Sequence, residues 1–479
     1  MKYIIPFALL IVIKSFSQTP ITDANFYQAI DTCLTTNPED GLCYDCEYGA
    51  MPDWNVSSIT NMSGAFRFEY NFNADLSNWD VGNVIDMSYM FFKADFNQDI
   101  GNWDVGNVTN MKRMFSYAYF NQDIGNWDVS NVTNMESMFR YAYFNQNIGN
   151  WDVSSVTNMQ GMFKDSEFNQ DIGNWDVSNV TTMSLMFKDS DFNQDIGNWD
   201  VGNVIHMNYM FSDSDFNQDI GNWDVGSVTI MLRMFYNTYF NHDIGNWDVG
   251  NVTDMHMMFE DSDFNYDIGN WDVSNVTNMQ SMFCNTYFNQ YIGNWDVGNV
   301  TDMSYMFEDS DFNQDIGNWD VGNVTDMSYM FSGSDFNQDI GNWDVRNVTN
   351  MNSMFTGAAT FNQDISSWCV EQIPDEPHKF ATSCPLLEEY KPRWGVDCIV
   401  GINDIESTES IFYPNPCESN INIYSNEITE LNIYNQHGHK VFNAETISNE
   451  IDISEISPGL YIIEMIRNNK KYRQKLIKK

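Results

Sequence analysis

Twelve aspartates recur every 24 residues, each directly after a tryptophan, and their type and spacing could support chemistry. The series is Asp80, Asp104, Asp128, Asp152, Asp176, Asp200, Asp224, Asp248, Asp272, Asp296, Asp320 and Asp344. An aspartate between an inward tryptophan and an inward valine points outward in an extended segment. Stacked at a step of about 4.8 Å, neighbouring carboxylates would repel by roughly 1 kcal/mol even in water. Hydrogen bonds from nearby Asn, Ser or Thr, raised pKa values, or bound cations such as calcium would relieve this repulsion.

The other titratable residues form no catalytic constellation. The histidines share no position in the repeat and lack triad or metal-ligand spacing. They are His206, His242, His256, His378, His437 and His439. Most carboxylates in the repeats recur at fixed offsets, whereas an active site is a singular feature. We therefore expect a non-enzymatic protein without a cofactor, with calcium as the one ion that the pattern suggests.

The cysteines gather on both sides of the repeated region, with Cys284 and Cys417 standing alone. The candidates for disulfides are Cys33, Cys43, Cys46, Cys369, Cys384 and Cys398. The Cys43-Tyr-Asp-Cys46 spacing would also suit half a zinc site, but no second pair or histidine cluster accompanies it. In an exported protein these cysteines favour disulfides that close the end units, with the pairing left open.

The charge of the chain excludes two classes of partner. The net charge is -45, and residues 54–367 carry 43 acidic against 9 basic residues, a balance of -34. Such a field repels nucleic acid and anionic lipid, both of which need a basic footprint. It favours solubility and attracts cations or basic partners.

A tryptophan recurs every 24 residues from Trp79 to Trp343, and this period is typical of a solenoid. Alternation in I-x-x-W-x-V predicts a short strand. Met111, Met114 and Phe115 share one face of a short helix, with Thr109 as its N-cap. We expect an α/β repeat resembling leucine-rich repeats. Thirteen to fourteen coils, each with a short strand and a short helix, would form a parallel sheet along one side.

The repeat W-D-V-S-N-V-T-N-M-x-x-M-F, followed by F-N-Q-D-I-G-N, resembles the BspA-type leucine-rich-repeat surface proteins of bacteria. Residues 127–150 show this pattern almost unbroken. The resemblance implies a cell-surface protein, with adhesion reported for some relatives, and leaves the ligand open as a protein or a glycan. The alternative is a structural or cation-coordinating component of a surface layer.

Two sets of positions vary within the otherwise regular coil. Lys112-Arg113 is replaced by Glu136-Ser137 in the next coil, and the residues after the Met-Phe pair change from Ser116-Tyr117-Ala118-Tyr119 to Glu260-Asp261-Ser262-Asp263. Variation on one exposed side of a rigid coil favours a surface scaffold that binds a ligand, although neutral drift would leave the same trace.

The segments that flank the repeats differ from them in composition. The apolar run from Tyr3 to Ile13 is too short to span a bilayer and, with Ser15 and Ser17, predicts a cleaved signal peptide. The mature protein is therefore expected to lack a transmembrane segment. An amphipathic helix over Thr22 to Leu34 would cover the first coil. The expected units are a signal peptide (1–17), an N-terminal cap (18–53), a solenoid (54–367), a C-terminal cap (368–400) and a linker (401–410).

Residues 411–479 carry no repeat and alternate in short runs separated by turns, which predicts a small all-β sandwich. Four motifs in this segment resemble the type A sorting domain of the type IX secretion system. The residues that carry the resemblance include Tyr413, Pro414, Asn415, Pro416, Gly438, Asp452, Gly459 and Tyr461. The resemblance implies engagement of the type IX machinery and an extracellular or outer-surface location.

Overall fold

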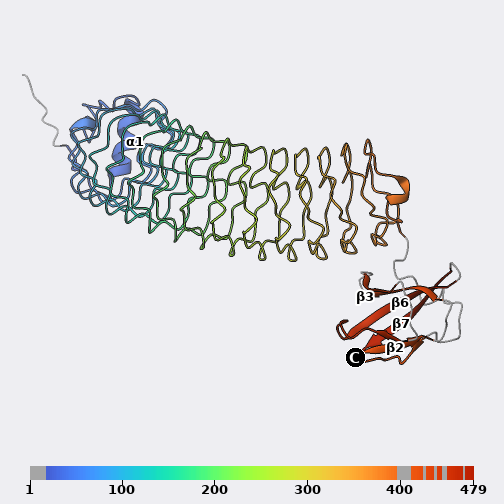
Figure 1. Cartoon of the computed structure of the whole chain (residues 1–479). Coiled ribbons are helices and arrows are strands. Elements are labelled where there is room, and N and C mark those ends of the chain that lie inside the picture. The colour runs from blue at the N-terminus through green and yellow to red at the C-terminus, as the bar shows by residue number, and fades with distance from the viewer. Residues whose placement is uncertain (1–17, 396–411, 424–427, 436–439, 445–449, 468–469) are drawn as a thin grey trace, which may run out of the picture.

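The computed structural model describes residues 18–395, 412–423, 428–435, 440–444, 450–467 and 470–479 (Figure 1). They form a long array of stacked coils and a small β unit near the C-terminus. The expected signal peptide and the linker 401–410 lie outside the described residues, as do Cys398 and Gly438.

One α-helix covers the first coil, as expected. Helix α1 spans Phe26–Thr36 and buries Phe26, Ile30 and Leu34 on one face. The ring of Phe26 meets that of Trp79 edge to face, 6.1 Å between centroids. A 3-10 turn, η1 (Met51–Asp53), then leads into the repeats. The helix thus buries apolar surface that the end of a solenoid would otherwise expose.

The coils themselves contain neither the short helix nor the strand at Trp-Asp-Val that we expected. Between residues 54 and 367 the described chain is built of turns and extended segments, joined by twelve single-residue parallel bridges. These bridges connect thirteen coils at the residue that precedes each coil's first methionine. They run through Asn61, Asp86, Asn110, Asn134, Asn158, Thr182, His206, Ile230, Asp254, Asn278, Asp302, Asp326 and Asn350.

The helical expectation for Met111, Met114 and Phe115 is wrong because the backbone between them reverses hand. Arg113 has φ 54° and Tyr117 has φ 60°, in the left-handed region of the backbone that residues other than glycine rarely adopt. The amides of Met111, Arg113, Phe115 and Tyr117 donate to carbonyls of the next coil, at 2.8–3.0 Å. In a right-handed helix these amides would instead donate to carbonyls of the same coil. Hydrogen bonds between stacked coils therefore take the place of hydrogen bonds within a helix.

Ladders of aromatic rings fill the centre of the array. Each tryptophan from Trp79 to Trp368 is 3–4% exposed, and its indole N–H donates to a carbonyl 27 or 28 residues earlier, as in Trp223 Nε1 to Ile196 O at 3.1 Å. The indoles of Trp199 and Trp223 stack with centroids 6.5 Å apart. The predicted inward placement of Trp, Val, Met and Phe is confirmed, because these residues are buried in every coil.

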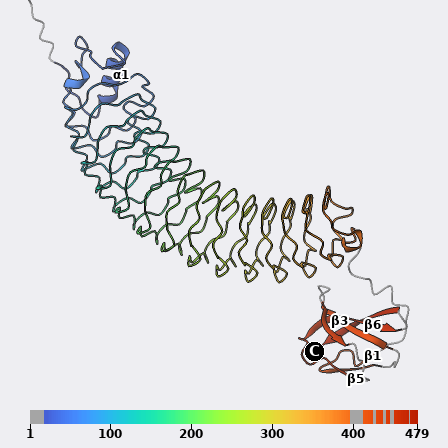
Figure 2. The same cartoon turned by 45° about the horizontal axis from the view of Figure 1, so that its top comes forward.

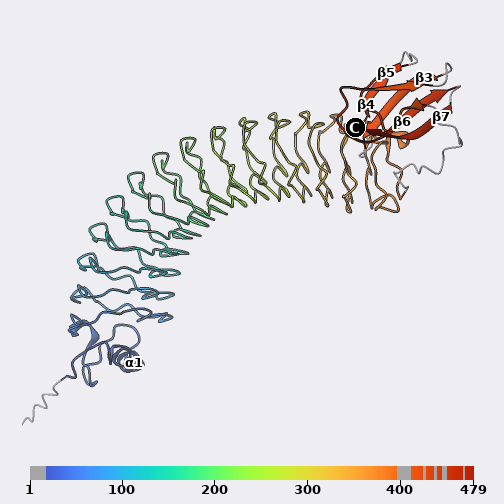
Figure 3. The same cartoon turned by 90° about the horizontal axis from the view of Figure 1, so that it is seen from below.

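The array bends, because its two sides have different spacings per coil (Figures 2 and 3). Equivalent tryptophan rings are 6.5 Å apart, whereas the rings of Tyr305 and Tyr329 on the opposite side are 4.6 Å apart. Tyr117 and Tyr141 are similarly close, at 4.4 Å. The wide tryptophan ladder therefore follows the outer side of the bend, and these tyrosines lie on the inner side.

The last coil closes the other end of the array. Phe380 meets Phe355 edge to face at 5.4 Å and is itself covered by Trp394 at 4.9 Å. A short 3-10 turn, η2 (Glu388–Tyr390), lies in this segment. No helix in the described part of the chain is long and apolar enough to cross a membrane.

The C-terminal unit consists of two antiparallel sheets. One sheet has the order β1 (Phe412–Tyr413), β2 (Asn420–Ile423), β5 (Glu450–Asp452). The other has the order β4, β3, β6, β7. Its strands are β3 (Ile428–Asn435), β4 (Lys440–Ala444), β6 (Gly459–Arg467) and β7 (Lys470–Lys478). Side chains of both sheets form one buried cluster, separate from the core of the coils.

Candidate functional site on the inner side of the array

The most variable surface of the coils is the run of four residues after each Met-Phe pair, or after Ala65-Phe66 in the first coil. We call these residues the variable ribbon. The tyrosines that mark the inner side of the bend include Tyr117 and Tyr141 of this ribbon. The ribbon segments are 67–70, 92–95, 116–119, 140–143, 164–167, 188–191, 212–215, 236–239, 260–263, 284–287, 308–311, 332–335 and 356–359.

Cations at the N-terminal end of the ribbon lie over aromatic rings. The Arg67 guanidinium is 4.8 Å from the ring centroid of Phe68 and 5.0 Å from that of Tyr89. Lys93 Nζ lies 4.9 Å from the Tyr117 ring. Arg140 lies 5.2 Å from Tyr141 and 5.9 Å from Tyr117. A cation within about 6 Å of a ring centroid is attracted by the ring's quadrupole, so these rings orient the cations.

Two rows of tyrosines continue this patch across neighbouring coils. Tyr117 stacks on Tyr141, and Tyr119 stacks on Tyr143 with 5.3 Å between centroids and 6° between planes. Tyr119 and Tyr143 are each about half exposed. Phe68 and Tyr70 add exposed rings in the first coil. We call residues 67–70, Tyr89 and segments 92–95, 116–119 and 140–143 the aromatic–cationic patch.

Charge is distributed unevenly along the ribbon. The six segments from 67 to 191 hold five cations and six acids, a balance of -1. The six from 212 to 335 hold nine acids and no cation, a balance of -9. The array as a whole is acidic, but this ribbon is almost neutral in its N-terminal half.

Half-buried acids mark the other half of the ribbon. Burial, with Asp261 nearby, raises the pKa of Glu260 to about 7. Burial and Asp309 also raise the pKa of Glu308. Cys284 lies between these two acids in the ribbon. Burial, and after it the charge of Glu260, raises the pKa of the Cys284 thiol, whose Sγ lies 3.9 Å from Glu308 Oε2. A thiol held protonated is a poor nucleophile.

The aspartate column is exposed as expected, but hydrogen bonds within each coil engage its carboxylates. Asp104 Oδ1 accepts the backbone N–H of Gly106 at 3.1 Å, and Asp128 Oδ1 accepts both the N–H and the hydroxyl of Ser130 at 3.1 and 2.6 Å. Bonds between coils come instead from the asparagines, such as Asn107 Nδ2 to Gly82 O at 2.7 Å.

The pKa shifts in the column run opposite to the rise that we considered. The Ser130 hydroxyl, with its backbone N–H, lowers the pKa of Asp128, and Asp176 and Asp272 behave in the same way through Ser178 and Ser274. Within the described residues, no group of three or more His, Cys, Asp or Glu is arranged to hold a metal ion. The calcium hypothesis for this column therefore gains no geometric support.

The cysteines at the ends of the array behave in two ways. Cys43 and Cys46 form a disulfide, and Cys369 is also disulfide-bonded. Cys33 and Cys384 are free thiols, contrary to our expectation. The Cys33 thiol donates to Gly41 O at 2.9 Å, because Cys43 is already paired with its near neighbour Cys46.

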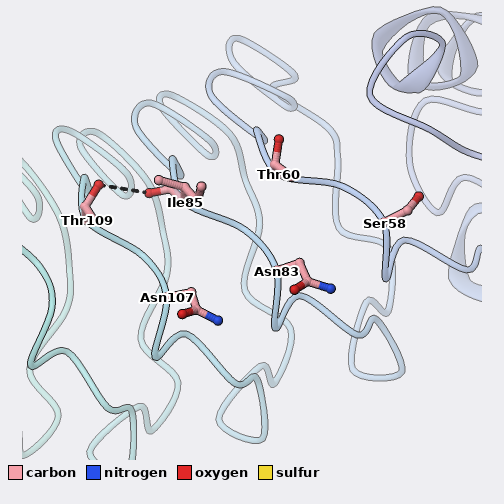
Figure 4. Close-up of a pocket in the computed structure, with 6 residues that line it drawn as sticks. All are labelled: Ser58, Thr60, Asn83, Ile85, Asn107 and Thr109. Atoms are coloured by element: carbon pink, nitrogen blue, oxygen red, sulfur yellow. Dashed lines mark hydrogen bonds between the residues drawn. The ribbon is translucent and has the colours of Figure 1, made fainter.

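A shallow hollow on another side of the first coils is a weaker candidate (Figure 4). Its lining comes from successive coils and consists of Ser58, Thr60, Asn83, Ile85, Asn107 and Thr109. The amides of Asn83 and Asn107 donate to carbonyls of the preceding coil, and so does the Thr109 hydroxyl, to Ile85 O at 3.4 Å. Because its donors already serve the stacking of the coils, the hollow offers a ligand little specific chemistry.

The residues expected to carry the sorting motif hold the β unit together. Asn415 donates to Lys475 O at 2.6 Å and accepts the Ile477 N–H at 2.9 Å, which fixes the segment between β1 and β2 against β7. Pro414 and Pro416 both follow cis peptide bonds. The Tyr461 hydroxyl donates to Ser457 O at 2.8 Å, and Asp452 accepts the Ser454 N–H. Gly459 begins β6, where it pairs with Lys478.

The aromatic–cationic patch was missed in the sequence because its members are 22 to 25 residues apart. Arg67 and Tyr89, for example, meet only when successive coils stack. Alignment of the four residues after each Met-Phe pair would have revealed the signal, since every cation of the ribbon precedes residue 192.

Comparison with known proteins assigns both parts of the chain. A family described as "Mycoplasma protein of unknown function, DUF285" matches residues 43–143, 116–215, 167–263, 212–310 and 285–394. A family described as "Secretion system C-terminal sorting domain" matches residues 411–479. No curated protein and no solved structure matches the chain.

These matches confirm the expected resemblance to BspA-type repeats and to a type IX sorting domain. The sorting domain indicates secretion to the cell surface or the extracellular space. Since the repeat model covers most of the chain, the protein belongs to the DUF285 repeat family and carries a C-terminal secretion sorting domain.

Proposed function

We propose that the secreted protein is a non-enzymatic adhesion or ligand-binding scaffold whose binding surface is the aromatic–cationic patch. The observation that carries the proposal is the group of exposed rings, Phe68, Tyr70, Tyr119 and Tyr143, in coils whose other large apolar side chains are mostly buried. Contiguous exposed aromatic surface marks interaction sites, and Tyr and Arg dominate binding energy at such sites. The inner side of a curved solenoid also presents an extended concave surface.

The absence of catalysis is part of this proposal. Two acids with raised pKa, Glu260 and Glu308, flank a protonated thiol rather than an activated nucleophile. The aspartate column repeats the same turn in coil after coil, which suits a structural role. The Cys284 thiol contacts Glu308, but its raised pKa makes it a poor nucleophile.

A second candidate is a structural or cation-coordinating component of a surface layer. The acidic half of the ribbon favours it, because its six segments hold nine acids and no cation, and only Asp213 among these acids pairs with a ribbon cation, Lys188 of the preceding segment. A surface of this kind would attract cations or basic partners rather than one specific ligand.

Capture of ligands by the mature secreted protein tests the first candidate. The immobilised protein is probed with extracellular-matrix proteins and with glycans, in parallel with the variant Tyr119→Ala/Tyr143→Ala. Tyr239→Ala/Tyr287→Ala is the matched control, since it removes two exposed tyrosines from the same ribbon position in the acidic half. Saturable binding that only the first variant loses supports the proposal. Binding to no probe, together with ordered self-assembly, would favour the surface-layer candidate.

A further inference from the structure

Three cations of the aromatic–cationic patch have no carboxylate partner in an otherwise strongly acidic array. Among the described residues, no salt bridge involves Arg67, Lys93 or Arg140. The Arg140 Nε atom is also buried without a hydrogen-bond acceptor. Arg67 is exposed, and Lys93 and Arg140 are partly exposed, so a ligand from outside the fold can reach these three side chains.

Other cations of the same region are neutralised within the chain. Lys112 pairs with Glu136 at 2.8 Å, and Lys188 pairs with both Asp189 and Asp213 at 2.8 Å. Acids are plentiful in the array, so the missing partners of Arg67, Lys93 and Arg140 do not reflect a shortage of carboxylates. Aromatic rings are the neighbours that these three residues have instead.

The rings orient the cations. Lys93 is within 6.0 Å of the rings of Phe68, Phe92 and Tyr117. A ring attracts a cation without cancelling its charge, so the full positive charge remains for a ligand. Arg67, Lys93 and Arg140 belong to the first, second and fourth ribbon segments, and they therefore form a short row along the inner side of the bend.

We propose that this row binds an anionic carbohydrate, a chain of sugar residues with carboxylate or sulfate groups, that runs along the coils. The inference rests on the proposed function, because it names the ligand class of the same patch. The three cations would contact the anionic groups of the sugar. The hydroxyls of Tyr119 and Tyr143 would meet its hydroxyls, and the ring edges would meet its apolar C–H groups.

The size and charge of the patch favour a sugar chain over a protein partner. A stable protein interface takes about 800 Å² and 20–30 residues from each side, whereas the patch offers a narrow row over four coils. A large acidic protein would also face the remaining charge of an array whose balance is -34. A short chain contacts the patch alone, where Glu69 and Asp95 accompany the three cations, and beyond about 8 Å the acids outside the patch are screened at physiological salt.

Titration of the mature secreted protein with defined oligosaccharides tests the inference. The probes are a sulfated hexasaccharide, a hexamer of uronic acid and an uncharged hexasaccharide, with a polyglutamate peptide and single-stranded oligothymidine as competing polyanions. We expect the sulfated sugar, the uronate sugar or both to bind, and the uncharged sugar to bind at least tenfold more weakly. Affinity should fall as salt rises from 50 to 500 mM.

Variants of single cations give the sharper result. Arg140→Gln and Lys93→Gln should each weaken binding of the charged sugar by about tenfold, the effect of losing one charge-assisted contact. Lys379→Gln is the matched control, since this exposed lysine of the last coil has φ 55°, close to the 57° of Lys93. Its binding should equal that of the parent protein.

Several outcomes would overturn the inference. They are equal binding of charged and uncharged sugars, no binding of either charged sugar, equal loss in Lys379→Gln, and equal or tighter binding of polyglutamate or oligothymidine. If a protein or a neutral glycan binds through Tyr119 and Tyr143 while the charged sugars do not, the proposed function stands and only the ligand class is wrong.

Discussion

Replacement of Trp223 by alanine tests how far the stacked indoles stabilise the array. Trp223 is 3% exposed, stacks on Trp199 at 6.5 Å and lies 6.2 Å from the Phe211 ring. Deletion of a large buried aromatic side chain costs about 3–5 kcal/mol, and we expect a loss in this range. Loss of the hydrogen bond from the Trp223 indole to Ile196 O adds little to this cost, because the same carbonyl also accepts the backbone N–H of Trp199 at 3.1 Å.

The conservative variant Trp223→Phe separates packing from hydrogen bonding. It keeps most of the ring and loses the indole N–H, so it should cost no more than about half of the loss in Trp223→Ala, mainly through lost volume. Because each coil contacts only its neighbours, a mid-array defect should also broaden or split the unfolding transition. Tyr239→Ala changes an exposed ring of the same coil and should stay within about 0.5 kcal/mol of the parent.

Urea unfolding followed by tryptophan fluorescence is the suitable assay. All 15 tryptophans lie between residues 54 and 394, so the signal reports the array and not the β unit. Circular dichroism in the absence of urea checks that the variants fold. A loss below about 1 kcal/mol for Trp223→Ala, well under the range for a buried aromatic residue, would refute the stabilising role of the indole ladder.

Three further predictions concern pH, calcium and export. Since the pKa of Glu260 is raised to about 7 from 4.5, the folded state holds its proton over that range, and stability should fall as pH rises from 4.5 through 7. Glu260→Gln should remove this dependence and be about 1–2 kcal/mol more stable than the parent at pH 8, after allowance for solvent screening. An unchanged pH profile of urea midpoints would contradict this. Millimolar calcium should leave the melting temperature unchanged, because hydrogen bonds already engage the aspartate column. A calcium-dependent rise in the melting temperature that chelation reverses would show that calcium binds. The mature secreted protein should lack residues from roughly 405 onward by mass spectrometry, as the sorting-domain match implies, and mature extracellular protein that ends at Lys479 would exclude this.

The sequence alone determined the periodic core and the two-part organisation. Trp223 and its equivalents are large, apolar and regularly spaced, and only burial against neighbouring coils can remove so many rings from water. The motifs from Tyr413 to Tyr461 indicated a separate unit, and the matches to both families agree. The helix over residues 26–36 was also predictable, because its apolar residues recur on one face.

Only the tertiary structure decided the path of the backbone within a coil and the position of the patch. The spacing of Met111, Met114 and Phe115 fits a helix, but the amides between them bond to the next coil, and this forces Arg113 into the left-handed region. Local spacing cannot reveal that competition, because the alternative acceptors are about 24 residues away. The same reason hid the contact between Arg67 and Tyr89, since stacking at a fixed period brings together residues that are distant in the chain.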